Sequence, residues 1–318
     1  MAELKNEFTW SKSRGDTFRT CLRKYYHQYY GSWGGWEPTA EISVRETYIL
    51  KQLKNRFLWA GEVVHQEVAH ILRRLSLGEN VTLEESLDRA RTRMRQQFAD
   101  SRARLYREKP KETTGFCEHE YQWPVRPEQW KASWTHVETC LRNFNDGEIL
   151  TRLKNLGPAA WKIIEDLMTF HLGDIPVFVK LDLAFEKEGQ LTVIDWKTSK
   201  SENGDKGLFQ LGCYALFARE EWGFATSHIR VIEANLYTGR HTTHTLDDEM
   251  LDDVAERIRA EVRVMRQALK DPLDNVADLD NFPMTEHREN CRSCNFQKLC
   301  YSQGMNVGQN ERVHEAVL

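Results

Sequence analysis

Several features that would place a chain in a broad class are missing from this sequence. No apolar run approaches the ~20 residues that a membrane-spanning helix needs, and the first eight residues are mostly polar rather than an apolar signal core. The phosphate-binding pattern G-x-x-x-x-G-K-[ST] is absent, which argues against a P-loop NTPase. Internal repeats and low-complexity tracts are also missing. We therefore expect a cytoplasmic protein with no membrane segment.

An excess of positive charge is lacking too. The formal net charge is −4 and the sequence pI is about 6.3. A protein that coats nucleic acid through bulk charge would be basic, so any nucleic-acid binding here has to use a local cationic groove. With 40% hydrophobic and 29% charged residues, the 318-residue chain has the composition of a globular protein. Its length suits one large domain or a domain with an insertion.

Two strand patterns flank a polar connection in the second half of the chain. Val177 to Phe185 and Leu191 to Lys197 are apolar and rich in β-formers, and the segment between them contains the glycine that a hairpin needs. Asp182 interrupts the first apolar run. In the second run, Asp195 and Lys197 are two residues apart and therefore lie on one face of the strand.

These polar residues have two interpretations. A buried strand rarely ends in a carboxylate and an ammonium unless they are paired or bind something, so a salt bridge that merely finishes the strand is one of them. In the other, the carboxylates of Asp182 and Asp195 hold a hard divalent cation such as Mg²⁺ or Mn²⁺ through oxygen. Lys197 would then orient a water molecule or stabilise the charge that develops on a phosphate.

The constellation resembles the core of the PD-(D/E)XK nuclease superfamily, with Asp182 in the first acidic position and Asp195-Trp196-Lys197 as the D-x-K half. Upstream, His65 ends the stretch Gly61 to His65. It is similar to the histidine that precedes the acidic motif in the RecB-type branch, where it is an additional metal ligand. By itself such a histidine is more often an ordinary helix residue, and the accompanying motifs favour the ligand.

A second match lies downstream of the D-x-K strand. Gln210 and Tyr214 form a Q-x-x-x-Y pattern, and a spacing of four places them on one face of a helix. In the RecB-type branch this motif lies beside the active site, where it contacts the nucleic acid or braces the metal site. An ordinary amphipathic helix is the alternative.

The third match is a set of cysteines. Seven cysteines in a cytoplasmic chain favour metal binding over disulfides. Cys291, Cys294 and Cys300 form C-x2-C-x5-C, and Cys21 lies far upstream. The arrangement resembles the iron–sulfur site of the CRISPR-associated adaptation exonucleases and of the AddB nuclease domain, and four thiolates suit a [4Fe–4S] cluster. Zinc and ordinary buried cysteines are the alternatives.

The N-terminal region combines basic and aromatic side chains. Ser13 is expected to cap a helix, whose tyrosines we expect to be buried. In the functional interpretation, Arg19, Arg23 and Lys24 contact phosphates of a nucleic acid beside the cluster.

Residues 80–170 are expected to form a mainly helical insertion. Within it, Cys117 to Val125 alternates well enough to be a strand, and Glu118 or Glu120 would then support the metal site. Pro124 to His171 has apolar residues at helical spacing.

Together these patterns predict an α/β protein: a mixed central sheet flanked by helices, with a restriction-endonuclease-like core. The whole chain, 1–318, would be one nuclease domain, with the insertion at 80–170 and a cysteine region at 284–304. An iron–sulfur cluster would join the ends of the chain.

The resemblance implies a Mg²⁺- or Mn²⁺-dependent deoxyribonuclease, most simply an exonuclease that prefers single strands. His65, Asp182, Asp195 and the backbone carbonyl of Trp196 would bind the metal. Lys197 would position the attacking water and stabilise the pentavalent phosphate, and Gln210 and Tyr214 would orient either the nucleic-acid strand or the lysine. DNA is the expected partner, with a helicase or another repair or defence subunit as a further candidate. The rivals are a non-cleaving nucleic-acid-binding or redox-sensing module and a zinc-stapled scaffold.

Overall fold

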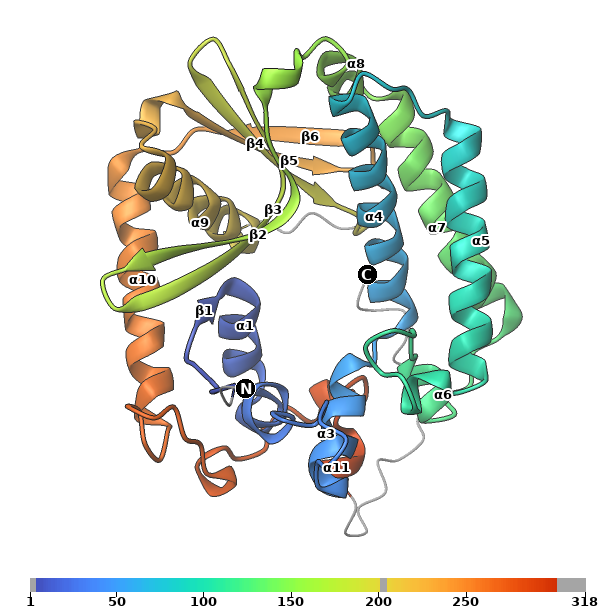
Figure 1. Cartoon of the computed structure of the whole chain (residues 1–318), viewed down its shortest axis with the longest axis vertical. Helices are drawn as coiled ribbons and strands as arrows, with labels where there is room; N and C mark the ends of the chain where they lie inside the picture. The colour runs from blue at the N-terminus through green and yellow to red at the C-terminus, as the bar shows by residue number, and fades with distance from the viewer. Residues whose placement is uncertain (1–3, 201–204, 302–318) are drawn as a thin grey trace. The chain divides into compact units, whose positions relative to one another are not determined.

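The computed structural model describes residues 4–200 and 205–301 (Figure 1). The chain divides into two compact units. The first comprises the described residues of Met1–Asn55, Gln96–Pro124 and Arg259–Val317, and the second comprises Arg56–Arg95 and Val125–Ile258. No helix in the described part of the chain is long and apolar enough to cross a membrane. The predicted division into one nuclease domain with an insertion at 80–170 stays a prediction.

The second unit contains a mixed β-sheet. Its strands are β2 (Trp161–Leu172), β3 (Ile175–Lys187), β4 (Gln190–Lys197), β5 (Ile229–Asn235) and β6 (Arg240–His244). They pair in the order β2-β3-β4-β5-β6, with β4 and β5 parallel and the other pairs antiparallel. The predicted α/β fold with a mixed sheet is therefore confirmed.

The predicted hairpin connects β3 and β4 through a two-residue turn. Glu188 and Gly189 both have positive φ, at 54° and 78°. That is the backbone of the type I′ turn, whose twist matches the flanking strands. The strand register ends with the pair Leu183 and Ile194. Asp182 and Asp195 occupy the next position on each strand, so the turn geometry brings the two acids to the same end of the hairpin.

Helices flank the sheet. Those confined to the second unit are α4 (Arg56–Ser76), α7 (Pro127–Asp146), α8 (Glu148–Leu153) and α9 (Asp205–Trp222), with the 3₁₀ turns η3 (Pro158–Ala160) and η4 (Thr226–His228). Helices α5 (Leu83–Arg102) and α10 (Asp248–Gln267) have residues in both units.

Helices α7 and α9 cover opposite faces of the sheet. The ring of Trp196 meets Phe144 of α7 edge to face, with centroids 5.6 Å apart. The preceding residue, Asp195, instead accepts a hydrogen bond from Tyr214 of α9. Successive side chains of a strand point to opposite faces, so each helix contacts one side of β4.

The prediction of a helix up to His171 is wrong in its second half, where β2 forms. Ile163 is buried near the start of the strand, and Phe170 and Leu172 are buried near its end. Odd and even positions lie on opposite faces of a strand, so the buried face changes along β2. The resulting spacing of apolar residues imitates a helix.

The predicted strand from Cys117 to Val125 is also wrong. Its first residues form the short helix α6 (Cys117–Glu120) in the first unit. The carboxylate of Glu120 accepts a hydrogen bond from Tyr106 at 2.7 Å and pairs with Arg107 at 2.9 Å and Lys298 at 2.6 Å. These partners satisfy the Glu120 carboxylate, and Glu118 lies on the same short helix of the first unit.

The first unit is built from short elements. They are β1 (Trp10–Ser11), α1 (Lys12–Thr20), α2 (Leu22–Tyr26), the π-helix η1 (His27–Gly31), α3 (Ile42–Gln52), η2 (Leu105–Arg107), α6, η5 (Leu279–Asn281), η6 (Arg288–Cys291) and α11 (Gln297–Tyr301). Ser11 rather than Ser13 caps α1, because its hydroxyl accepts from the Arg14 backbone N–H at 3.2 Å. The extended backbone of Cys21, with φ of −165°, then separates α1 from α2.

Of the tyrosines near the N-terminus, Tyr25 is buried as expected, whereas Tyr26, Tyr29 and Tyr30 are half-buried. Tyr25 is fully buried and stacks on Phe282, with centroids 5.9 Å apart. Arg14, also buried, donates hydrogen bonds to the hydroxyls of Tyr25 and Tyr30, each at 3.0 Å. This aromatic core holds α1 and α2 against the segment that leads to the C-terminal cysteines.

Candidate active site

One group of potential metal ligands converges in the second unit. Nδ1 or Nε2 of His65 and one carboxylate oxygen each from Glu165 and Asp182 lie within 4.8 Å of one another. His65 projects from α4, Glu165 from β2 and Asp182 from β3. Among the described residues, it is the one set of three or more such side chains gathered this tightly.

Asp182 uses both of its oxygens. Oδ1 lies 3.2 Å from Nδ1 of His65, and Oδ2 accepts a hydrogen bond from the Trp196 backbone N–H at 2.8 Å. Glu165 Oε2 lies 3.8 Å from the same His65 nitrogen, and Lys180 forms an ion pair with the other Glu165 oxygen. The histidine is therefore held between two carboxylates that come from neighbouring strands.

The second acid, Asp195, belongs to a closed ring of side chains. Lys197 Nζ lies 2.6 Å from Asp195 Oδ2 and donates to Gln210 Oε1 at 2.8 Å. Gln210 Nε2 lies 2.6 Å from the Tyr214 hydroxyl, which donates to Asp195 Oδ1 at 3.4 Å. The Q-x-x-x-Y motif on α9 thus fixes Lys197 between an amide oxygen and a carboxylate.

The pKa values reflect this crowding. Burial and the nearby carboxylate of Asp182 raise the pKa of Asp195 to about 6, against the opposing effect of Lys197. Burial alone would lower the pKa of His65, but Asp182 and Glu165 outweigh it and raise that pKa to about 10. Burial would raise the pKa of Glu165, but His65 and Lys180 bring it down to about 2. Without a metal, the two carboxylates therefore favour the protonated form of His65.

The donor set fits a hard divalent cation. Asp195 is only 2% exposed, and its Oδ2 is buried against the Lys197 ammonium at 2.6 Å. In a strand, the N–H and C=O of one residue point to the same edge, and the Trp196 N–H points at Asp182. The Trp196 carbonyl therefore faces the same edge. Carboxylate and carbonyl oxygens are the ligands that Mg²⁺ and Mn²⁺ prefer.

Glu165 was missed by the sequence analysis. It lies directly across from Asp182 in the register of β2 and β3, since its neighbours Ile164 and Asp166 pair with Leu183 and Leu181. The available signal was the Gly173-Asp174 dipeptide between two apolar runs, which favours a hairpin. The segment was instead predicted to be helical, so Glu165 was not placed on a strand beside Asp182.

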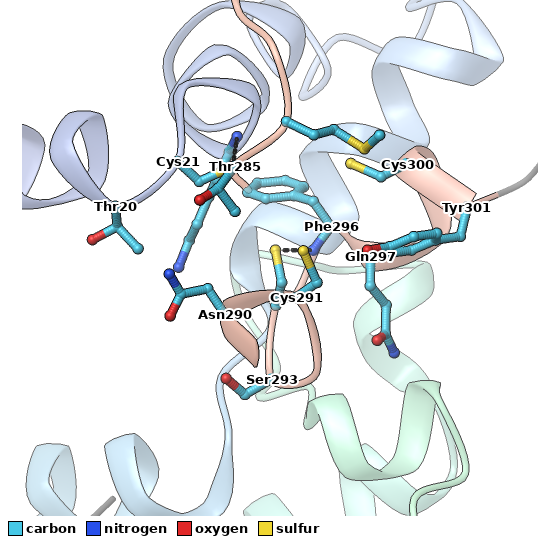
Figure 2. A pocket seen from close by; sticks show the side chains of 13 residues that line it. Thr20, Cys21, Thr285, Asn290, Cys291, Ser293, Phe296, Gln297, Cys300 and Tyr301 are labelled. Carbon is cyan, nitrogen blue, oxygen red and sulfur yellow. Dashed lines mark hydrogen bonds between the residues drawn. The ribbon is translucent and has the colours of Figure 1, made fainter. Parts of the chain in front are cut away.

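The four predicted cluster cysteines meet at one pocket in the first unit. Cys21, Cys291, Cys294 and Cys300 all line it, and Figure 2 shows side chains from both ends of the chain around it. Lys24 lines it too, from α2. The cysteines are free thiols, and no three of their sulfurs converge as tightly as the three ligand atoms of the carboxylate site.

The thiols have polar and cationic neighbours. Backbone N–H groups lie 3.4 Å from two of the sulfurs, that of Lys24 from Cys21 and that of Phe296 from Cys294. Burial raises the pKa of Cys300 to about 11, and the other three cysteines add to this. Without a metal, the Cys300 thiol therefore keeps its proton at neutral pH.

The predicted DNA contacts have partners within the first unit. Arg19 forms ion pairs with Glu261 and with Asp16, the latter at 2.6 Å. Arg23 donates to the Phe282 carbonyl at 2.7 Å, and Lys24 lines the cysteine pocket. Their assignment to nucleic-acid binding stays a prediction.

The second unit has two acids at the ends of adjacent strands, a lysine two residues beyond the second acid, and helices on both faces of a mixed sheet. This arrangement defines a restriction-endonuclease-like phosphodiesterase core. A family model agrees: that of the PD-(D/E)XK nuclease superfamily matches residues 9–301. The chain belongs to this superfamily. No curated protein matches it with significance.

Proposed function

We propose that the chain is a Mg²⁺- or Mn²⁺-dependent deoxyribonuclease of the RecB-like branch that carries a [4Fe–4S] cluster. The convergence of His65, Glu165 and Asp182 beside the Asp195–Lys197 pair carries the nuclease part. The meeting of four cysteines at one pocket supports the cluster part.

Metal binding would use His65, Asp182, Asp195 and the Trp196 carbonyl, with Glu165 adding a carboxylate. When bound, the ion lowers the pKa of a coordinated water and offsets charge on the scissile phosphate. Before binding, His65 has to release its proton, because a protonated imidazole cannot be a ligand. The two carboxylates that now hold the imidazolium would face the ion instead.

Lys197 would act on the phosphate. Its ammonium group is held by Asp195 at 2.6 Å and by Gln210 at 2.8 Å, so little reorganisation is needed when charge develops on the phosphate oxygens. Tyr214 supports Gln210 from the same helix. We assign Gln210 and Tyr214 to orienting the lysine.

The cysteine pocket favours iron–sulfur over zinc. One tetrahedral zinc at Zn–S of about 2.3 Å would require four sulfurs about 3.8 Å apart, and no three cysteine sulfurs are gathered that tightly. A cluster spreads its four thiolates around a larger body, and N–H groups beside the sulfurs are among the contacts that tune it. The cluster would tie α2 to the C-terminal segment and act structurally, as a crosslink does.

The test is degradation of end-labelled single- and double-stranded DNA by anaerobically purified protein with Mg²⁺, Mn²⁺ or EDTA. We expect metal-dependent cutting that Asp195→Ala abolishes, and a product ladder that shows the polarity. The same sample should be brown, with absorbance near ~400 nm, whereas zinc is silent.

The rivals predict different results. A brown, folded and metal-binding protein that cuts neither DNA form would indicate a non-cleaving module. A colourless protein that contains zinc would indicate a zinc staple while leaving the nuclease proposal intact.

A further inference from the structure

Glu165 has an uncommon backbone conformation for its residue type. Its φ is 54°, in the left-handed region that glycine adopts without cost and a glutamate does not. Such conformations persist when surrounding contacts enforce them, and they gather at functional sites. The carboxylate carried by this backbone lies 3.8 Å from His65. The contacts that enforce the conformation therefore also place the carboxylate.

Arg73 supplies such contacts from α4, the helix that carries His65. Its Nη2 donates to the Ile164 carbonyl at 2.9 Å and to the Glu165 carbonyl at 3.4 Å. The two carbonyls flank the φ and ψ rotations of Glu165, so one guanidinium nitrogen spans the left-handed residue.

We infer that Arg73 is a positioning residue for the metal site, which it serves by holding the Glu165 backbone so that the carboxylate faces His65 and Asp182. This inference rests on the proposed function, because it assigns Arg73 to the same metal site. Helix α4 then has two tasks: His65 offers a ligand, and Arg73, two turns further on, fixes the strand that offers another.

The neighbouring arginine provides a matched control. Arg74 lies next to Arg73 on α4 and carries the same charge, but its guanidinium pairs with Glu79 rather than with the backbone of β2. Arg73→Gln and Arg74→Gln therefore remove equal charge from almost the same place. Any general electrostatic effect on metal or DNA should appear in both variants.

The experiment measures Mn²⁺ affinity of the full chain by calorimetry. We expect Arg73→Gln to weaken binding about tenfold, the lower end of the effect of residues that orient metal ligands, and Arg74→Gln to leave it unchanged. Glu165→Gln should weaken binding to a similar degree. If Arg73 acts through Glu165, Arg73→Gln should cause no further loss in the Glu165→Gln background.

Crystal structures of the metal-free wild type and Arg73→Gln give a readout that does not need metal binding. We expect Glu165 to leave the left-handed region in the variant. Retention of that conformation in Arg73→Gln, additive losses in the double variant, or an equal loss in Arg74→Gln would each overturn the inference. A wild type that neither binds Mn²⁺ nor cuts DNA would instead refute the proposed function, and the crystal structures would still decide whether Arg73 holds Glu165.

Discussion

The carboxylate site of the second unit takes its acids from strands that are neighbours in the sheet, whereas the cysteine pocket of the first unit joins Cys21 to three cysteines from the opposite end of the chain. Strand register brings the positions of Glu165, Asp182 and Asp195 together, and the hydrogen bonds of the sheet maintain that register. At the pocket, no strand ladder within residues 4–200 and 205–301 links the contributing segments. The sulfurs surround a space without converging on a point.

This difference predicts different responses to the substitution of a site residue. A site built into a sheet should lose its chemistry when one side chain changes, while the fold remains. A site that joins distant segments should lose stability first, since its ligand acts as a crosslink. The following predictions test this contrast, beginning with the largest effect.

Lys197→Met should reduce the DNA cleavage rate by about 10²–10³-fold, because it removes a charge that is already placed to meet the developing phosphate charge. Mn²⁺ affinity should change little. Lys187→Met, at the turn end of the same hairpin, is the matched control, since Lys187 is exposed and lies beside Glu188. Single-turnover cleavage and calorimetry measure the two quantities. Unchanged cleavage by Lys197→Met would remove this lysine from the mechanism.

Cys294→Ser should abolish absorbance near ~400 nm and lower the unfolding free energy by about 2–5 kcal/mol, as loss of a long-range crosslink does. Mn²⁺ binding at the carboxylate site should persist while the protein is folded. Cys140→Ser, which changes a buried cysteine of α7, should keep the absorbance. If Cys294→Ser retained both colour and melting temperature, the pocket would not hold a cluster.

Mn²⁺ affinity should rise about tenfold per pH unit between pH 6.5 and pH 8.5. The pKa of His65 is raised to about 10 and that of Asp195 to about 6, so in this window the site holds one proton, on the imidazole. The ion has to displace it. Calorimetry in buffers of different ionisation enthalpy counts the released proton. His70→Ala, on the same helix, should not change the count, and a pH-independent affinity would contradict the assignment.

Acid should destabilise the first unit through His27. Burial and the nearby Arg23 lower its pKa from 6.5 to about 4, so the folded state favours the neutral imidazole. Above pH 6.5, the protonation of His27 does not reduce the unfolding free energy. As the pH falls from 6.5 toward 4, the unfolded state binds a proton that the folded state does not, so the unfolding free energy decreases by up to about 1.4 kcal/mol per pH unit. Denaturant unfolding from pH 7 to pH 4.5 measures it. His27→Phe should unfold with a shallower pH dependence, and an equal slope would exclude His27 as the source.

Elements encoded by adjacent residues could be predicted from the sequence. The β3–β4 hairpin follows from two apolar runs and a Glu188-Gly189 turn, and the D-x-K spacing places Asp195 and Lys197 on one face of β4. Helix α9 follows from its periodicity, and its Gln210 and Tyr214 indeed face one another.

Elements that depend on contacts with a distant segment could not be predicted from the sequence. Strand β2 has no simple alternation, because its buried face changes along its length, and only pairing with β3 makes it a strand. Glu165 gave no signal of its own, since its left-handed backbone depends on contacts from another element. The capping residue of α1 is Ser11 rather than the predicted Ser13, because helix boundaries inferred from sequence are uncertain by a residue or two.

The sequence by itself determined the chemistry of the site: two acids, a lysine, a histidine and a bracing motif, each recognisable from spacing along one element. The tertiary structure placed a further carboxylate, that of Glu165, beside His65 and Asp182, and it brought four cysteines to one pocket. The physical reason is the distance along the sequence between the residues that determine each feature. Turn and strand patterns follow from neighbouring residues, whereas the place of Glu165 depends on strand pairing and on an arginine 92 residues away, from which it accepts a hydrogen bond.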